Sequence, residues 1–382
     1  MNAIFLGSLD SEQRRMIVEA SANAAYAAPG YLLFYRDKAL MAQPFDLRRF
    51  ALTGEPTTIA SDVQFLPQVD RAVFTVSDSG VLIVQGVSRA AQSQLLWFDR
   101  SGKQVGSLGK PAMYGNVALA PDGKRVAYDI TDLDSLNIDL WTMDLARGTA
   151  QRFTFDPAID ETPVWSPDGR QLLFGSNRSL AVDLFIRNSD GSGEDKLILH
   201  VGGTTNNPPT DWSRDGRYIL YQRETELWYL TLPGLQTKPF LQTRSVVTNG
   251  QFSPDGHWVA YASNETGRWE VYVASFPEPR GKWQVSSGGG QQPRWRGDGK
   301  ELFYLSPEGK MMAVQVQTGN TFDAGTPIAL FQARPHKQIA ALDLFTYDVS
   351  RDGQRFLINT QVEHPEASPM SVILNWTAEL RK

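Results

Sequence analysis

Acidic side chains recur in this sequence at one kind of place where a carboxylate could bind a metal or act in catalysis. Each stands directly before a glycine, in segments such as SPDG and SRDG: Asp122, Asp168, Asp215, Asp255, Asp298 and Asp352. In a tight turn, Asp accepts hydrogen bonds from nearby backbone amides, and Gly adopts a positive φ without strain. We therefore interpret these carboxylates as turn-forming groups rather than as metal ligands or catalytic groups.

The residue types that most often hold metals are scarce. The chain has no Cys, and its four His residues are scattered: His200, His257, His336 and His364. Thiolate sites and iron–sulfur clusters are excluded, and four isolated imidazoles do not predict a His-ligated metal. We expect no metal and no cofactor.

A second candidate site consists of polar residues that precede apolar, strand-like runs. Asp160 and Glu161 are adjacent, and paired carboxylates with different pKa values can divide acid and base work. Together with polar residues at similar places in other repeats, they form the predicted binding funnel: Tyr114, Asn116, Asp160, Glu161, Asn206, Asn207, Thr248, Asn249, Gln291 and Gln292.

An internal repeat positions both sets of residues. Residues 164–174 read VWSPDGRQLLF, residues 211–221 read DWSRDGRYILY, and residues 251–261 read QFSPDGHWVAY. Eight copies align on the turn glycines Gly30, Gly80, Gly123, Gly169, Gly216, Gly256, Gly299 and Gly353, at intervals of 50, 43, 46, 47, 40, 43 and 54 residues. This period with an Asp-Gly turn predicts β-propeller blades.

The repeat predicts an all-β fold in which residues 1–382 form a single propeller of four-stranded antiparallel blades. Eight blades fit the turn glycines, and seven is the alternative. The predicted full blades are residues 23–60, 71–109, 114–155, 161–200, 207–242, 247–286 and 291–331. Outer strands from residues 1–20 and inner strands from residues 345–377 share the closing blade, because a shared blade leaves no weak seam in the ring. Recurrence at fixed repeat positions predicts that five Trp residues pack between neighbouring blades: Trp141, Trp165, Trp212, Trp228 and Trp295.

Charge and hydropathy exclude several classes of partner. With 37 Lys plus Arg against 42 Asp plus Glu, the net charge is −5, so we expect no nucleic-acid partner. No run of 18 apolar residues is present, so we expect no membrane insertion of this chain. The first 20 residues lack the features of a signal peptide, and the sequence as written predicts a cytoplasmic protein.

The turn segments resemble the repeats of TolB-like, WD40-like PD40 propellers. Residues 29–60 (PGYLLFYRDKALMAQPFDLRRFALTGEPTTIA) and 374–380 (LNWTAEL) further resemble the C-terminal propeller of bacterial serine/threonine protein kinases. In that family the propeller follows a kinase domain and usually a membrane span, which would make it extracytoplasmic. The sequence contains no glycine-rich phosphate loop, no His-Arg-Asp and no Asp-Phe-Gly. The resemblance therefore implies a kinase-associated sensor or scaffold propeller without kinase activity.

We expect a non-catalytic module whose funnel, at the mouth of the central channel, binds a protein segment or a small polar ligand. The alternative is a hydrolase or lyase in which Asp160 and Glu161 act as acid and base. A Gly-x-Ser-x-Gly nucleophile segment is absent, so a serine hydrolase is not expected.

Overall fold

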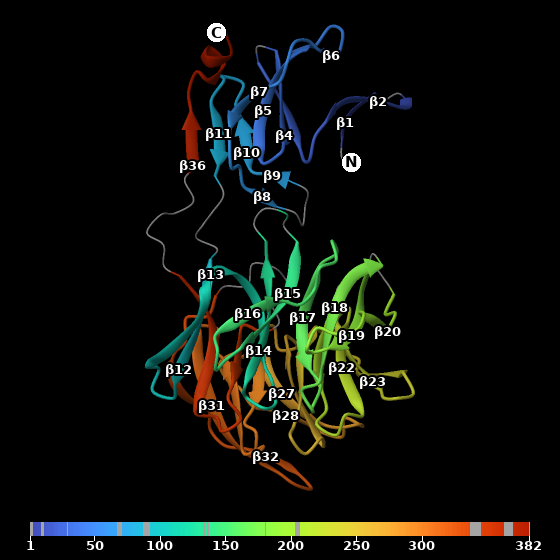
Figure 1. Cartoon of the computed structure of the whole chain (residues 1–382), viewed down its shortest axis with the longest axis vertical. Coiled ribbons are helices and arrows are strands. Elements are labelled where there is room, and N and C mark those ends of the chain that lie inside the picture. The colour runs from blue at the N-terminus through green and yellow to red at the C-terminus, as the bar shows by residue number, and fades with distance from the viewer. Residues whose placement is uncertain are drawn as a thin grey trace. The chain divides into compact units, whose positions relative to one another are not determined.

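The structure is a computed structural model that describes residues 3–8, 11–28, 30–66, 71–86, 92–132, 135, 137–179, 181–202, 207–336, 345–362 and 370–381. Antiparallel strands form nearly all of its regular structure, so the predicted all-β class is confirmed. The chain divides into two compact units (Figure 1). Unit 1 comprises Met1–Ala91 with Glu363–Lys382, and unit 2 comprises Gln92–Val362. Within the described residues, no helix is long and apolar enough to cross a membrane.

Unit 1 contains several small sheets. β1 (Ala3–Ser8) and β2 (Ser11–Glu19) form a hairpin, and β8 (Phe65–Leu66) pairs with β9 (Arg71–Ala72). A larger sheet contains β3 (Ala24–Ala27), β4 (Tyr31–Arg36), β5 (Ala39–Asp46), β6 (Ala51–Leu52) and β7 (Thr57–Ala60). A fourth sheet has the order β10 (Phe74–Val76), β11 (Leu82–Gln85) and β36 (Met370–Ile373).

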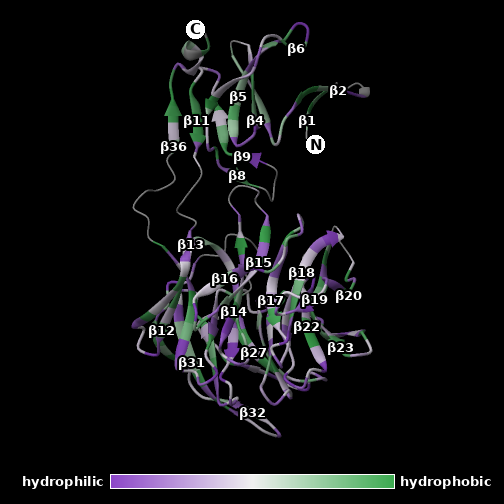
Figure 2. Ribbon diagram, in the orientation of Figure 1, coloured by the Kyte–Doolittle hydropathy of each residue, from purple (hydrophilic) through white to green (hydrophobic). Residues whose placement is uncertain are grey.

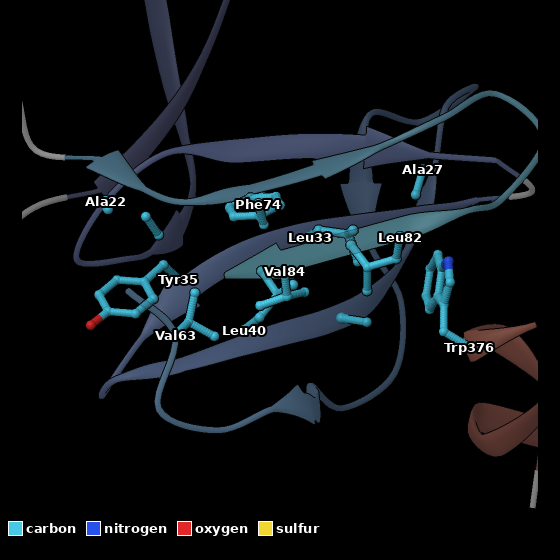
Figure 3. Close-up of a cluster of buried hydrophobic side chains, with 12 residues drawn as sticks. Ala22, Ala27, Leu33, Tyr35, Leu40, Val63, Phe74, Leu82, Val84 and Trp376 are labelled. Carbon is cyan, nitrogen blue, oxygen red and sulfur yellow. The ribbon is translucent and has the colours of Figure 1, made fainter. Parts of the chain in front are cut away.

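The core of unit 1 is apolar and joins residues from both ends of the chain. Leu33, Leu40 and Leu82 are fully buried, and Trp376 from the 3-10 helix η3 (Trp376–Arg381) packs beside them (Figure 3). The Trp376 ring meets the Tyr31 ring edge-on, with 5.5 Å between centroids. Burial of such a large aromatic side chain contributes strongly to the stability of a small unit.

Unit 2 repeats one array of four antiparallel strands six times within its described residues. The inner strands, each of which ends at a turn, are β13 (Gln104–Leu119), β17 (Asp160–Trp165), β21 (Pro209–Trp212), β25 (Val247–Phe252), β29 (Gln291–Trp295) and β34 (Tyr347–Val349). The second strands are β14 (Arg125–Thr131), β18 (Gln171–Ser179), β22 (Tyr218–Arg223), β26 (Trp258–Ser263), β30 (Glu301–Leu305) and β35 (Arg355–Gln361).

The third and fourth strands complete each array. The third strands are β15 (Ile138–Asp144), β19 (Ala181–Asn188), β23 (Glu226–Thr231), β27 (Glu270–Ser275), β31 (Lys310–Thr318) and β12 (Ser93–Asp99). The fourth are β16 (Thr149–Arg152), β20 (Lys196–Leu199), β24 (Gln236–Leu241), β28 (Lys282–Gln284), β33 (Ile328–Gln332) and the first half of β13. β32 (Phe322–Ala324) pairs with the end of β31. In Figure 2, hydrophobic residues appear in strands of both units, such as β11, β15 and β36.

The six inner strands surround a common axis. Each contacts the next in the cyclic order β13, β17, β21, β25, β29, β34 and back to β13. The long strand β13 serves two arrays, because its first half pairs with β12 and its second half with β14. Trp165, Trp212 and Trp295 pack against side chains of the preceding array, as their recurrence predicted.

The turns between the first two strands form as their residues predict. At the second turn, Ser166 Oγ donates to Asp168 Oδ1 at 2.7 Å, and the same Asp oxygen accepts the Arg170 amide at 3.0 Å. Gly169 has a φ of 68°. Similar bonds engage Asp215, Asp255 and Asp352, which confirms that these carboxylates serve their turns.

The predicted closure of a single propeller by the two chain ends is wrong. β1 and β2 pair with each other in unit 1, and β36 pairs with β11 there. Instead, unit 2 closes when β35 pairs with β12 along seven consecutive positions, from Ser93↔Gln361 to Asp99↔Arg355. The predicted blade 71–109 is therefore divided between the units, and six arrays rather than eight or seven surround the axis.

The physical reason is that a turn glycine specifies only its own hairpin. Residues 23–60 and 71–86 contain such hairpins, but their strands join sheets of unit 1. Which free edge an outer strand completes depends on side-chain packing between distant segments, and the spacing of turns carries no information about it.

Candidate functional site: a pocket along the axis of unit 2

A cavity of about 380 Å³ lies among the inner strands of unit 2. All six inner strands contribute to its lining, so we call it the channel pocket. One repeat position, five residues before the turn glycine, faces it in every array, and we call these side chains the inner ring: Ala118, Val164, Asp211, Gln251, Arg294 and Asp348. Alternation along a strand explains why one position faces the axis while its neighbours pack between arrays.

Arg294 extends from β29 to three other inner strands. Its Nη1 donates to Gln251 Oε1 at 2.9 Å, and its Nε and Nη2 donate to the carbonyls of Tyr347 and Val117, both at 3.4 Å. The guanidinium lies 3.9 Å from the centre of the Phe345 ring. These contacts hold a buried cation within the pocket and connect β25, β34 and β13 through one side chain.

Asp348 neutralises this cation. Its Oδ1 lies 3.5 Å from Arg294 Nε and accepts the amide of Val349 at 2.8 Å. Its Oδ2 accepts the amide of Leu119 on the neighbouring strand at 2.7 Å. A buried ion pair requires such further hydrogen bonds to offset the cost of desolvation.

Asp211 has no ion pair among the described residues. Its Oδ2 accepts the amide of Phe252 at 2.7 Å. Burial raises the pKa of Asp211 to about 7, although backbone hydrogen bonds and the charges of Arg294 and Arg214 act in the opposite direction. Near neutral pH, this carboxyl group therefore gains or loses a proton readily.

The exposure of the lining residues shows where the pocket meets solvent. Pro121, Arg214 and Arg351 are exposed and lie at the turns, whereas Thr162 and Phe345 at the other end of the inner strands are buried. We call the end with the Asp-Gly turns the turn face. Within the described residues, the pocket is accessible from this face.

Several residues of the predicted funnel are buried and connect neighbouring arrays. Asn116 donates to Asp129 Oδ2 at 2.8 Å and accepts the amide of Phe345 at 2.9 Å. Gln292 Oε1 accepts a hydrogen bond from the backbone amide of Thr346 at 2.8 Å. The backbone amide of Gln292 donates to Asn249 Oδ1 at 3.4 Å. We call Asn116, Asn249 and Gln292 the polar belt. Their bonds link neighbouring arrays near the end of the inner strands that lies opposite the turn face.

A shared backbone conformation helps to place the belt. Thr162, Asn249 and Gln292 occupy the same repeat position and have φ values of 53°, 56° and 57°. The pairing register of β17, β25 and β29 shifts at these residues. Each of these three strands therefore has a bulge at this position, which turns side chains toward neighbouring arrays.

The predicted acid and base pair lies away from the channel pocket. Asp160 is fully buried, and its Oδ2 accepts a hydrogen bond from Arg178 at 2.8 Å. Burial raises the pKa of Asp160, against the effects of Ser176 and Arg178. Glu161 is 2% exposed, and neither carboxylate lines the pocket. Solvent access, which a hydrolase or lyase needs for its substrate, is absent at both carboxylates.

The other predicted residues have local bonds. Tyr114 donates to the Lys110 carbonyl at 2.8 Å, and Thr248 donates to Gln222 at 2.9 Å. Asn207 accepts the Glu224 amide at 3.2 Å, and Gln291 begins β29 with a half-buried side chain. Asn206 lies outside the described residues. Of the ten predicted residues, Asn116 alone lines the channel pocket, so a binding role for the others remains a prediction.

The inner ring was missed because the predicted residues stand two to five positions too early in each repeat. The signal that could have identified it is polarity at a strand position: Asp211, Gln251, Arg294 and Asp348 stand where Ala118 and Val164 stand in other repeats. A cluster of three or more His, Asp or Glu side chains that could hold a metal does not occur among the described residues.

Residues 98–229 match the family model of the TolB beta propeller domain, PD40. The model covers about a third of this chain, and the likeness to TolB propellers is shown for that segment. The match covers the first two arrays and most of the third, and it includes the inner-ring residues Ala118, Val164 and Asp211.

Similar curated proteins cover only part of the chain. An "Uncharacterized peptidase YuxL" of Bacillus subtilis is 26% identical over 192 residues, which is 38% of this chain and 29% of that protein. The "Tol-Pal system protein TolB" of Wolinella succinogenes is 23% identical over 199 residues, which is 52% of this chain and 38% of that protein. The matched segments therefore span less than two fifths of either relative.

A solved structure shows the same kind of fold. The structure of a putative TolB from Agrobacterium tumefaciens superposes with a TM-score of 0.54 at 15% identity, and covers 70% of this chain and 97% of that chain. At this identity the likeness concerns the fold. Propeller folds support binding and catalysis alike, so function has to be argued from the site.

Proposed function

We propose that unit 2 is a non-catalytic binding module that takes a protein segment or a small polar ligand into the channel pocket from the turn face. The TolB-like family supports a binding module in general terms. The observation that carries the specific proposal is a cavity at the axis with four polar inner-ring side chains and exposed residues at one end. A concave site with a few convergent polar groups is typical of ligand binding.

The chemistry of the pocket favours recognition over turnover. Arg294, Asp348 and Gln251 are fixed by bonds to one another and to the backbone. Such fixed groups preserve the shape of a binding site at little entropic cost when the ligand arrives. The hydrolase or lyase alternative has less support, because the predicted pair Asp160 and Glu161 is buried outside the pocket.

A role as a sensor or scaffold attached to a kinase belongs to this proposal as well. It rests on the resemblance of residues 29–60 and 374–380 to kinase-associated propellers. Binding in the channel pocket would be the sensing event in such a protein, whichever domains accompany the chain.

The proposal is tested by filling the pocket. A random peptide library displayed on phage is selected against the full chain, and bound peptides are then measured against Ala118→Trp and Val164→Phe, which add volume at inner-ring positions. Ala150→Trp on β16 is the matched control, because Ala150 is exposed on an outer strand. We expect the selected peptides to lose at least tenfold in affinity to either filled variant and to keep their affinity for the control.

Circular dichroism and melting curves establish that each variant is folded. If peptides that bind the wild type bind both filled variants equally well, the channel pocket is not the binding site.

A further inference from the structure

Two arginines interrupt a repeat position at the mouth of the channel pocket. Two residues before the turn glycine, four arrays have Pro or Gly, at Pro121, Pro167, Pro254 and Gly297. The other two arrays have Arg214, in the turn after β21, and Arg351, in the turn after β34. In the cyclic order of inner strands these turns are three arrays apart, and the Arg214 side chain reaches the turn after β29, where the amide of Gly297 donates to the Arg351 carbonyl.

These two guanidiniums have no carboxylate within 4 Å among the described residues. Arg214 donates to the Gly297 carbonyl at 2.8 Å, and it lies close enough to Arg351 to be affected by its charge. Burial first, and then the like charge of Arg351, lowers the pKa of Arg214. Two cations close together at a pocket mouth repel, and an anion bound between them removes that repulsion.

Arginines elsewhere on the turn face contrast with this pair. Arg170, Arg217 and Arg296 lie within 4 Å of the carboxylate of the Asp in their own turn. Arg214 and Arg351, by contrast, line the pocket mouth and have no ion pair in their own turns, which lie among the described residues. Arg355, which also lines the pocket, stacks over Trp97 at 5.1 Å. The mouth thus has a cationic rim above the inner ring.

The aromatic lining argues against a carbohydrate as the anion. Guanidiniums occupy a face of Trp97, Trp165 and Phe345, at 5.1, 4.6 and 3.9 Å respectively. Trp212 and Trp295 are buried between arrays. A sugar ring usually stacks on an open aromatic face, and these rings are occupied, whereas a peptide carboxylate needs only the guanidinium donors.

Arg294 limits how deeply a ligand can reach. Because it crosses from β29 to the carbonyl of Val117 on β13 and to Gln251 on β25, it obstructs the axis. A chain threaded through the channel would have to displace these bonds. A side chain that enters from the turn face does not.

We infer that the mouth of the channel pocket binds the side-chain carboxylate of an acidic peptide segment between Arg214 and Arg351. This inference rests on the proposed function and specifies its ligand. The acidic side chain lies across the mouth, its carboxylate accepts hydrogen bonds from both guanidiniums, and the segment that carries it runs over the turn face.

The test uses the full chain and four fluorescent probes: hexaglutamate, hexaglutamine, hexalysine and hexagalacturonate. Hexaglutamate is expected to bind at least tenfold more tightly than hexaglutamine or hexalysine. The double variant Arg214→Gln/Arg351→Gln is expected to weaken hexaglutamate binding at least tenfold. Arg170→Gln is the matched control, since it removes a positive charge from the same face outside the pocket, and it is expected to change the affinity less than twofold.

Each result separates the inference from the proposed function. The inference is overturned if hexaglutamate and hexaglutamine bind equally, if the double variant binds hexaglutamate as the wild type does, or if hexagalacturonate binds more tightly than hexaglutamate. If library peptides still respond to Ala118→Trp in any of these cases, the pocket binds a ligand of another chemistry and only the inference fails. If no peptide responds to Ala118→Trp, the proposed function fails first.

Discussion

Removal of Arg294 tests whether one buried side chain joins several arrays of unit 2. Arg294→Met keeps an unbranched apolar stem, although a shorter one, and deletes the charge and the donors. The variant loses a 2.9 Å hydrogen bond to Gln251, two 3.4 Å bonds to carbonyls, the ion pair with Asp348 and the contact with the Phe345 ring.

The expected loss of stability follows from these contacts. A hydrogen bond from a charged donor contributes about 1.5–3 kcal/mol, and a partly buried cation–π contact contributes about 1 kcal/mol. Removing one partner of a buried ion pair costs about 3–5 kcal/mol when the other is left alone. Asp348 keeps two backbone donors, from Leu119 and Val349, so we expect a total near the lower limit, about 3 kcal/mol.

Urea unfolding followed by Trp fluorescence measures this loss. Nine of the ten Trp residues lie in unit 2, and Trp376 alone lies in unit 1, so the signal reports mainly on unit 2. Arg170→Met is the control for loss of an exposed Arg on the turn face. Adding Asp348→Asn to Arg294→Met should cost less than the sum of the single changes, with a coupling of about 1 kcal/mol. A loss no greater than that of Arg170→Met would refute the reasoning.

Three further predictions concern other contacts. Because the pKa of Asp211 is raised from 3.8 to about 7, its protonated form stabilises the fold at pH 5, and this contribution disappears as the pH rises toward 8. The melting temperature of the wild type relative to Asp211→Asn should therefore be higher at pH 5 than at pH 8, and an equal difference at both pH values would contradict this. Arg100→Met removes bonds to both Glu301 oxygens, at 3.0 and 2.7 Å, and should cost about 2 kcal/mol in urea unfolding; a change below about 0.5 kcal/mol, typical of a surface substitution, would show that the pair is not needed. Trp376→Ala should make residues 11–86 more sensitive to limited proteolysis and leave residues 92–362 as resistant as in the wild type, because Trp376 packs in the core of unit 1. Mass spectrometry of the fragments locates the cleavage sites. Cleavage that begins in residues 92–362 would argue against separate cores for the two units.

Local chemistry made the hairpins of this fold predictable from sequence. Each turn is decided within about six residues, such as Ser166, Asp168 and Gly169, whose bonds do not depend on the rest of the chain. The Trp residues at the ends of inner strands were predictable for a similar reason, since a bulky side chain at a fixed repeat position requires a neighbouring array.

The closing strand and the site depend on distant contacts. The sequence of β12 fits a third strand in any array, and only its pairing with β35, more than 250 residues away, determines which array it completes. At the site, Asp160 and Asn116 are polar because they bond inside the protein, and a sequence does not distinguish such residues from solvated ones. The inner ring has apolar residues in the first two arrays and four polar residues of three types in the others, so no shared residue type marks its position in the repeat.

The pairing of β12 with β35 is the contact on which the ring and its pocket depend. The chain has no Cys, so a pair of introduced cysteines gives an unambiguous disulfide. Gln94→Cys/Thr360→Cys and Ser93→Cys/Gln361→Cys place them at adjacent paired positions, and Cα atoms of paired residues lie about 4.5–5.5 Å apart, within disulfide range. Phe5→Cys/Thr360→Cys tests closure through the hairpin of unit 1 instead. On mild oxidation, we expect intramolecular crosslinks in the first two variants and none in the third; crosslinking of Phe5 to Thr360, with none between β12 and β35, would contradict the six-array ring.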